Sequence, residues 1–361
     1  METRQVYGIM AIEVYVMKLK RGLFLLALLI LFGGCFYIMN QHYDELARYP
    51  FELNEKERAI VLDKFDTEQI NYLVTQKIEP QQFLPFIKEE EFQLENTLWY
   101  TRAMDSRKEE PTYIVNFINK YRDRMDYASL QDLLKNYSYN VLTRFYDEGY
   151  EYASEGEVSL IADPTYRYTL LDETHTVYTY EPSDLVAITS LPHDSIVDNA
   201  NDIMIKKEVV KPLESLMKAA KDINQKDYGD MTITTGYLSY EDQVSLMSSM
   251  QKKYPGKDFL LHWDYPGQSE YQLGYTITLA PNTSSEEDKD KKEEADKEQA
   301  TWIKENAYKY GFVVRYPKQK ESITHKLYQP FTLRYVGKEM AKHMYDQEKA
   351  MEEVNFEVFE K

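Results

Sequence analysis

Residues 269–279, with the sequence SEYQLGYTITL, contain the pattern that decides the fold. From Gly274 onward, apolar and aromatic side chains alternate with threonines, and successive side chains of an extended chain point to opposite faces. One face carries Tyr275, Ile277 and Leu279, and the other carries Thr276 and Thr278. The alternation predicts a β-strand with one face packed against a core.

Further strands and helices are predicted on both sides of this segment. A helical face is indicated by Val209 and Leu213, and a second helix over residues 302–310 is expected to end at Gly311, because glycine accommodates a left-handed C-cap. Helix and strand patterns mix without a regular βαβ rhythm, which indicates an α+β fold. The additional strand segments are residues 231–235, 312–316 and 331–336.

The overall composition excludes several classes of protein. The 361 residues include 61 acidic and 43 basic side chains, for a formal net charge of −18. Phosphate backbones are repelled by such a surface, so nucleic acid is not expected as a partner. The single cysteine, Cys35, excludes a disulfide framework and a cysteine-rich zinc module.

The N-terminus carries an apolar segment, residues 22–39, that contains no charged side chain. Its length is close to that needed for a helix to cross the hydrocarbon core of a bilayer. Lys18, Lys20 and Arg21 precede it, and such basic flanks stay in the cytoplasm. The sequence therefore predicts a cytoplasmic N-terminus at residues 1–21, a single-pass cell-membrane anchor and an extracytoplasmic remainder.

Two alternatives stay open at this end of the chain. The segment that begins at Met17 is typical of the start of a bacterial export signal, so that residues 1–16 would be an upstream extension. Residues 32–35 (FGGC) resemble a lipobox, in which Cys35 would carry the lipid. The apolar run continues past Cys35 to Met39, which favours an uncleaved anchor over a lipoprotein.

Composition divides the rest of the chain into further regions. Residues 40–150 show short amphipathic helical patterns, and we expect them to form a juxtamembrane helical region. Residues 155–345 carry the mixed strand and helix signals. They contain a highly charged insertion at residues 284–300, which cannot bury a core and is expected to be solvated. Residues 346–361 form an acidic C-terminal tail.

Five blocks of residues carry a family resemblance. They are residues 180–186 (YEPSDLV), 234–243 (TTGYLSYEDQ), 266–274 (PGQSEYQLG), 305–312 (ENAYKYGF) and 333–337 (LRYVG). In this order, over about residues 160–345, the sequence resembles the VanY-type D-alanyl-D-alanine carboxypeptidases, which are zinc peptidases of peptidoglycan. The resemblance implies a small antiparallel sheet flanked by helices, as in the D-Ala-D-Ala carboxypeptidase/hedgehog-like fold, and a location in the bacterial cell envelope.

The chain departs from this family at the positions of its reactive centre. The resemblance implies that two histidines and an aspartate of the family are replaced here by Tyr271, Thr332 and Thr278, and the general-base glutamate by Gln329. Protonated phenols and alcohols are poor zinc ligands, and a carboxamide does not accept a proton at neutral pH. The sequence therefore predicts no intact catalytic residue, no metal ligand and no cofactor.

Other residues offer a relocated metal site as an alternative. His262 and His325 flank the family blocks, and Asp264 and Glu270 lie near them in the sequence. The competing interpretation is that both histidines are ordinary loop residues. The family arginine that meets a substrate carboxylate corresponds here to Leu238, which removes a charged partner for such a ligand.

The sequence predicts a membrane-anchored, VanY-like pseudoenzyme that binds a peptidoglycan stem peptide or an envelope protein. The predicted ligand-binding residues are Leu238, Gln243, Ser269, Tyr271 and Gln329. The alternative is an active metallo-D,D-carboxypeptidase that trims cell-wall stem peptides with other metal ligands. Metal content and release of D-alanine distinguish the two hypotheses.

Overall fold

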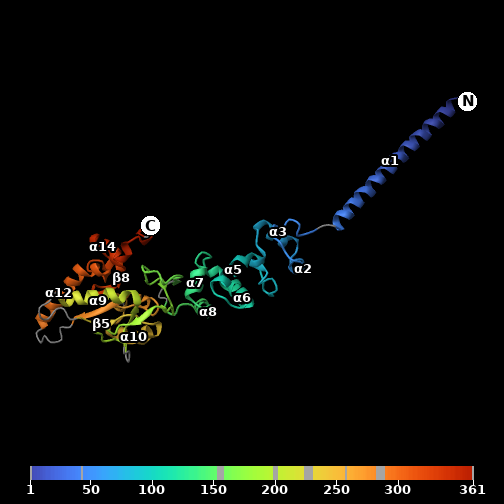
Figure 1. The fold of residues 1–361 in the computed structure, drawn as a ribbon. Helices are drawn as coiled ribbons and strands as arrows, with labels where there is room; N and C mark the ends of the chain where they lie inside the picture. Colours follow the sequence, from blue (N-terminus) through green and yellow to red (C-terminus); the bar gives the residue numbers. More distant parts are fainter. Residues whose placement is uncertain are drawn as a thin grey trace. The chain divides into compact units, whose positions relative to one another are not determined.

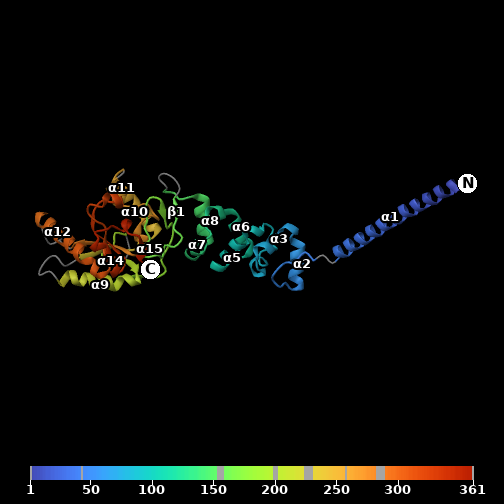
Figure 2. The same ribbon diagram turned by 90° about the horizontal axis from the view of Figure 1, so that it is seen from above.

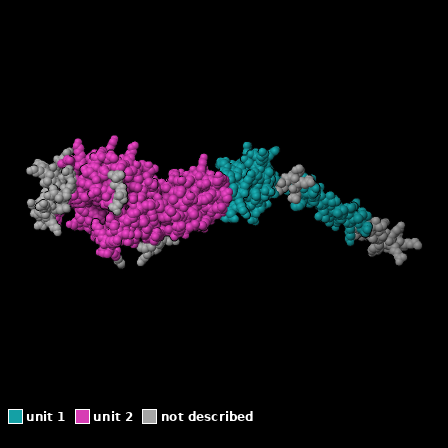
Figure 3. Space-filling model, turned by 90° about the horizontal axis from the view of Figure 1, so that it is seen from below, with its two compact units in different colours: residues 1–101 teal, residues 102–361 magenta. Residues whose placement is uncertain are grey.

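The computed structural model describes residues 2–41, 44–152, 158–197, 202–222, 231–256, 258–281 and 289–359. The chain divides into two compact units, residues 1–101 and 102–361, and the division falls within helix α5 (Thr97–Ser106) (Figure 3). The charged insertion lies partly outside the described residues, since residues 282–288 are not among them. Its second part belongs to helix α12 (Lys289–Asn306).

The first unit begins with one long helix, α1 (Glu2–Gln41). Within it, residues Tyr15–Met39 have a mean hydropathy of 2.4 and are not buried by the rest of the chain. A helix of this length and composition is suited to cross a membrane or to serve as a signal sequence. The predicted apolar N-terminal helix is therefore confirmed, and its role is considered below.

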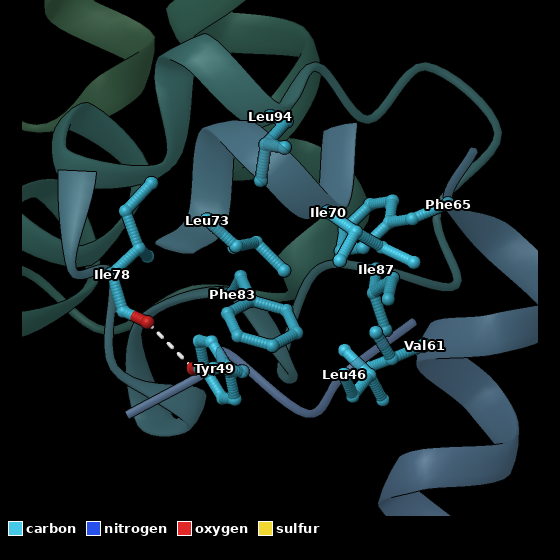
Figure 4. Packing of buried hydrophobic residues seen from close by; sticks show 10 residues of the cluster. All are labelled: Leu46, Tyr49, Val61, Phe65, Ile70, Leu73, Ile78, Phe83, Ile87 and Leu94. Carbon is cyan, nitrogen blue, oxygen red and sulfur yellow. Dashed lines mark hydrogen bonds between the residues drawn. The ribbon is translucent and has the colours of Figure 1, made fainter. Parts of the chain in front are cut away.

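The remainder of the first unit is a small helical body with its own apolar core. The helices are α2 (Glu55–Lys64), α3 (Thr67–Gln76) and α4 (Pro80–Phe83). Asn54 and Asp66 each close a capping box that satisfies free backbone amides at a helix start. Phe83 is fully buried between the helices, and Tyr49 donates a hydrogen bond to the carbonyl oxygen of Ile78 (Figure 4). The core is thus built from short helices joined by capped turns.

The second unit begins with three more helices: α6 (Pro111–Tyr121), α7 (Leu130–Asn136) and α8 (Tyr139–Glu148). Their buried faces are rich in aromatic rings. Phe117 packs edge-on against Tyr139, with ring centroids 4.9 Å apart. The Tyr139 hydroxyl donates to the carbonyl oxygen of Ala103 at the end of α5. The helical pattern predicted for residues 40–150 is therefore observed over the described part of that range.

A four-stranded antiparallel sheet follows and forms the framework of the second unit. Its strand order is β5-β6-β8-β7, with β5 (Met231–Thr235), β6 (Thr276–Pro281), β7 (Phe312–Tyr316) and β8 (Gln329–Tyr335). Helices α9 (Lys207–Asp222), α12 and α14 (Lys338–Asp346) lie to one side of it, and α10 (Tyr240–Lys253) and α11 (Asp258–His262) lie to the other (Figures 1 and 2). The predicted α+β fold with a small antiparallel sheet is confirmed.

Smaller elements complete the second unit. They are the strand pairs β1 (Ser159–Leu160) with β2 (His175–Thr176) and β3 (Leu185–Ala187) with β4 (Met204–Lys206), and the helices α13 (Glu321–Thr324) and α15 (Phe356–Phe359). The short 3₁₀ helices are η2 (Arg122–Arg124), η3 (Glu270–Leu273), η4 (Ala307–Tyr310) and η5 (Met351–Glu353). Met351 and Phe356, which lie in the predicted acidic tail, pack into a core cluster with residues of α14. Gly311 has φ +90°, as the predicted C-cap requires.

Candidate functional site

The three predicted metal-ligand positions lie together on one face of the sheet. Thr278 of β6 pairs directly with Thr332 of β8 in the antiparallel ladder, and their hydroxyl oxygens are 3.2 Å apart. Tyr271, in η3, places its hydroxyl oxygen 2.5 Å from the Thr278 hydroxyl oxygen. The strand register and the short helix therefore bring one phenol and two alcohols to a single point.

The hydrogen bonds of this cluster have a fixed direction. Thr332 donates its only hydroxyl proton to the side-chain oxygen of Gln329, over 3.0 Å. Because a hydroxyl group has one proton, Thr332 must accept from Thr278, and Thr278 must accept from Tyr271. The Gln329 amide nitrogen then donates to the carbonyl oxygen of His262, at 3.4 Å. We call these four residues, Tyr271, Thr278, Thr332 and Gln329, the hydroxyl chain.

In the hydroxyl chain, Tyr271 and Thr332 are buried, Thr278 and Gln329 are half-buried, and all four side chains are neutral. Tyr271 is 9% exposed and Thr332 is 3% exposed. Burial raises the pKa of the Tyr271 phenol, against the opposing effect of its hydrogen-bond interactions with Thr278 and Thr332, so the phenol keeps its proton at neutral pH. Trp263 stacks near the Tyr271 ring, with centroids 6.0 Å apart. The arrangement contains hydrogen-bond donors and acceptors but no group that can act as a base at neutral pH.

A buried ion cluster lies beside the hydroxyl chain. Glu270 accepts from the Arg315 side chain at 2.8 Å and pairs with Arg334 at 3.3 Å, and all three side chains are nearly inaccessible to solvent. Burial by itself raises the pKa of the Glu270 carboxyl, but the charges of Arg315 and Arg334 outweigh it and hold that pKa below its ordinary value. Glu270 is therefore the shared counter-ion of two strand arginines rather than a free ligand.

The other residues considered for a relocated metal site also have different partners. Asp264 forms an ion pair with Lys326 at 2.7 Å, and the His262 ring stacks on Tyr254 with centroids 3.9 Å apart. His325 ends α13 in a left-handed conformation, and its side chain is exposed. Among the residues that the structure describes, no three His, Cys, Asp or Glu side chains form a group suited to a metal ion. The described residues therefore do not assemble the relocated site.

Three of the predicted ligand-binding residues belong to the interior. Leu238, Gln243 and Ser269 are 2%, 0% and 1% exposed. The Gln243 amide donates to the Leu238 carbonyl oxygen and to the side chain of Gln272, and its oxygen accepts from the backbone of Gly267. These bonds hold the turn before η3 in place. Contact of these residues with a ligand stays a prediction.

Sequence reasoning missed the roles of Arg315 and Lys326. Arg315 is 2% exposed although it lies in the otherwise apolar strand β7. A charged side chain in such a strand needs a buried counter-ion, and this was the signal available in the sequence. The sequence could not identify Glu270 as the partner of Arg315, because these two residues are 45 positions apart in the chain.

Comparison with known proteins places this site in a family. The family model described as VanY, D-alanyl-D-alanine carboxypeptidase, matches residues 202–338. The bifunctional D-Ala-D-Ala dipeptidase and D-Ala-D-Ala carboxypeptidase VanXYC of Enterococcus gallinarum is 30% identical over 143 residues, which cover 38% of this chain and 70% of VanXYC. The chain belongs to the VanY family.

Two further comparisons define the extent of the likeness. The protein YodJ of Bacillus subtilis (strain 168) is 37% identical over 179 residues, which are 48% of this chain and 61% of YodJ. The matched segment is thus less than two thirds of that relative. A VanY D,D-pentapeptidase from a VanB-type vancomycin-resistance cassette, solved in complex with Zn(II), is 23% identical, with a TM-score of 0.39, and covers 52% of this chain and 97% of the other.

The zinc complex corrects the prediction that no cofactor is involved. A VanY D,D-pentapeptidase has been solved with Zn(II), so the loss of zinc that the sequence predicted for this chain is not shown. The sequence prediction failed because it inferred the absence of an ion from the side chains at three positions. The donors at those positions do not fit zinc as they stand, since zinc prefers imidazole, thiolate and carboxylate ligands and these hydroxyls bond to one another.

Proposed function

We propose that this VanY-family protein is anchored in the cell membrane and binds a peptidoglycan stem peptide outside the cell without hydrolysing it. The family supports the class of ligand, since the name of VanXYC describes action on D-Ala-D-Ala. The position of Gln329 at the end of the hydroxyl chain is the observation that carries the absence of hydrolysis. An envelope protein as partner stays the alternative that the sequence left open.

The chemistry of the hydroxyl chain supports binding rather than proton transfer. Hydrolysis of a peptide bond by a bound water needs a nearby group that accepts the water's proton. The carboxamide of Gln329 cannot accept one, and the raised pKa keeps the Tyr271 phenol protonated at neutral pH. The oxygen of Gln329 already accepts from Thr332. The four side chains therefore provide hydrogen bonds in a fixed direction and no general base.

The properties of α1 support the proposed location. Its apolar part, Tyr15–Met39, contains 25 residues, and at about 1.5 Å per residue it exceeds the roughly 30 Å of hydrocarbon in a bilayer. Lys18, Lys20 and Arg21 lie at its N-terminal side, which favours a cytoplasmic N-terminus. The second unit would then meet the peptidoglycan outside the membrane.

The proposal is tested with the full chain in detergent micelles, with VanXYC as a positive control. A stem pentapeptide ending in D-Ala-D-Ala is added with and without Zn²⁺, and its binding and the release of D-alanine are measured separately. We expect saturable binding and no release under either condition. Release of D-alanine at a rate that depends on protein concentration would refute the non-hydrolytic role. Failure of the pentapeptide to bind would refute the proposed ligand.

A further inference from the structure

A cavity of about 380 Å³ lies in the second unit, and no residue of the hydroxyl chain lines it. Its size falls within the range of small-molecule sites. The lining comes from five separate segments: the loop before β2, the residues from α11 to η3, the end of β7, the end of α13 with the turn after it, and η5. Glu173 and Glu352 lie outside residues 202–338, so part of the cavity is built from sequence beyond the family match.

Two buried side chains each present an unpaired polar atom to this cavity. Gln268 and Tyr316 both line it, and they are only 4% and 8% exposed. The Gln268 amide nitrogen donates to the backbone carbonyl oxygen of Glu173 at 3.0 Å, which leaves Oε1 as an acceptor. Neither this Oε1 atom nor the Tyr316 hydroxyl bonds to any residue that the structure describes, and neither is closed off from solvent as Arg315 Nη1 is. Their remaining exposure is therefore toward the cavity that they line.

The two basic side chains of the lining have no donor to offer a ligand. The Lys326 ammonium bonds to the Asp264 carboxylate at 2.7 Å and to two backbone carbonyl oxygens at the end of α11, at 2.6 and 3.0 Å. These three bonds use its three protons. Arg315 is paired with Glu270 and Glu352, and its remaining nitrogen, Nη1, is buried. The cavity therefore offers no exposed cationic donor to an anion.

The lining as a whole is negatively charged. It contains four carboxylates and two basic side chains, which leaves a net charge of −2 when histidine is counted as neutral. Asp172 is already bonded to Thr174 and His175. The carboxylate of Glu173 is exposed at the rim and forms no hydrogen bond or ion pair within the described part of the chain. Such a charge distribution repels an anion and attracts a cation.

The Tyr316 hydroxyl lies within this negative potential. Burial, and then the charges of Asp264 and Glu270, raise the pKa of the Tyr316 phenol against the opposing charge of Arg315, so the phenol keeps its proton. A protonated phenol still accepts hydrogen bonds through its oxygen lone pairs. The ring of Tyr265 also lines the cavity, and the faces of tyrosine rings attract cations. The unpaired acceptors and the aromatic rings thus favour the same kind of ligand.

We propose that this cavity binds a small aliphatic primary amine as its ammonium ion, held by Gln268 Oε1 and the Tyr316 hydroxyl oxygen. A primary ammonium group brings three donors, one positive charge and no acceptor. It therefore complements a lining that has unpaired acceptors and excess negative charge. A neutral polyol would donate to the same atoms but would leave that charge uncompensated. The assignment does not depend on the proposed function, because the cavity and the hydroxyl chain share no residue.

The proposal is tested by ligand-observed NMR titration of the full chain in detergent micelles, with empty micelles as the blank. The four probes are butylamine, 1-butanol, tetramethylammonium and myo-inositol. 1-Butanol keeps the alkyl chain without the charge, and tetramethylammonium keeps the charge without an N–H donor. We expect butylamine to bind saturably at pH 7. Each of the other three should bind about tenfold or more weakly, because it lacks the charge-assisted hydrogen bonds.

Substitutions locate the amine within the chain. Tyr316→Phe removes a hydroxyl that makes no hydrogen bond in the described structure, so we expect the thermal midpoint to be retained while butylamine binds about five- to tenfold more weakly. Glu173→Gln removes one charge at the exposed rim and should weaken butylamine by about two- to fivefold. Tyr335→Phe, on the neighbouring strand β8 and outside the cavity, is the matched control and should bind butylamine like the wild type.

Three outcomes would overturn the proposal. They are the absence of saturable butylamine binding, binding of a neutral probe as tightly as butylamine, and unchanged butylamine affinity in both Tyr316→Phe and Glu173→Gln. The proposed function is judged separately, by binding of the stem pentapeptide and by release of D-alanine. Failure of the pentapeptide to bind would leave the amine site standing, and failure of the amine to bind would leave the proposed function standing.

Discussion

Replacing Glu270 by glutamine removes the carboxylate that Arg315 and Arg334 share. Glu270 lies 2.7 Å from Arg315 and 3.3 Å from Arg334, and the three side chains are 3%, 2% and 0% exposed. Breaking a buried ion pair by removing one partner costs about 3–5 kcal/mol, because the remaining charge is left buried without compensation. For a unit of this size, we expect the thermal midpoint to fall by roughly 6–20 °C.

The same cluster predicts a dependence of stability on pH. The pKa of Glu270 in the folded protein lies below the ordinary value of 4.5, since the two arginine charges outweigh the effect of burial. The folded state therefore binds the proton less tightly than the unfolded state. The stabilisation is fully present above about pH 4.5 and is lost as the pH falls through the folded pKa. Glu270→Gln should remove this part of the pH dependence.

The assay is urea unfolding of the full chain in detergent micelles, followed by tryptophan fluorescence between pH 3 and pH 7. Trp263 and Trp302 lie in the second unit and report on the cluster, while Glu305→Gln on the exposed face of α12 serves as the control. The control should unfold like the wild type at every pH. Two results would refute the argument that these charges depend on one another. One is a fall of less than about 1 kcal/mol in the free energy of unfolding of Glu270→Gln, and the other is a decrease in its stability at acid pH as large as that of the wild type.

Three further substitutions test the packing around the site and in the first unit. Gly236→Ala would place a Cβ atom 2.6 Å from a backbone carbonyl oxygen of β4, so we expect a clear loss of stability in urea unfolding; wild-type stability would contradict this contact. Phe83→Ala empties the centre of the first-unit core and should cost about 3–5 kcal/mol, measured by hydrogen exchange of α2 and α3, with unchanged exchange as the contrary result. Tyr271→Phe removes the first donor of the hydroxyl chain and should cost about 1–2 kcal/mol in the same urea assay, whereas no loss would argue that this hydrogen bond does not stabilise the fold.

The sequence predicted the elements whose signals are local. Alternation in residues 274–279 indicated β6, and the repeat of Val209 and Leu213 indicated α9. Gly311 marked a helix end because few other residues adopt φ +90° without strain. The long apolar run indicated α1. Each of these signals depends either on the spacing of apolar side chains in one short segment or on the backbone conformation of that segment. Neighbouring residues in the sequence are enough to recognise either property.

The chemical identity of the candidate site was also available in the sequence. Aligning the family blocks was enough to find a phenol, two alcohols and a carboxamide at Tyr271, Thr278, Thr332 and Gln329. Inferring the absence of a cofactor from these identities was wrong, because the family includes a member solved with Zn(II). Residue identity states which donors are present, but it does not establish which ion a protein binds.

Only the tertiary structure decided which of these residues meet and what each of them does there. The pairing of Thr278 with Thr332 depends on strand register, and that pairing fixes the direction of donation in the hydroxyl chain. The role of Glu270 as the counter-ion of Arg315, and the cavity that Arg315 helps to line, arise from segments far apart in the chain. The physical reason is that charge pairing and cavity shape depend on distances across the fold, whereas the sequence records only distances along the chain.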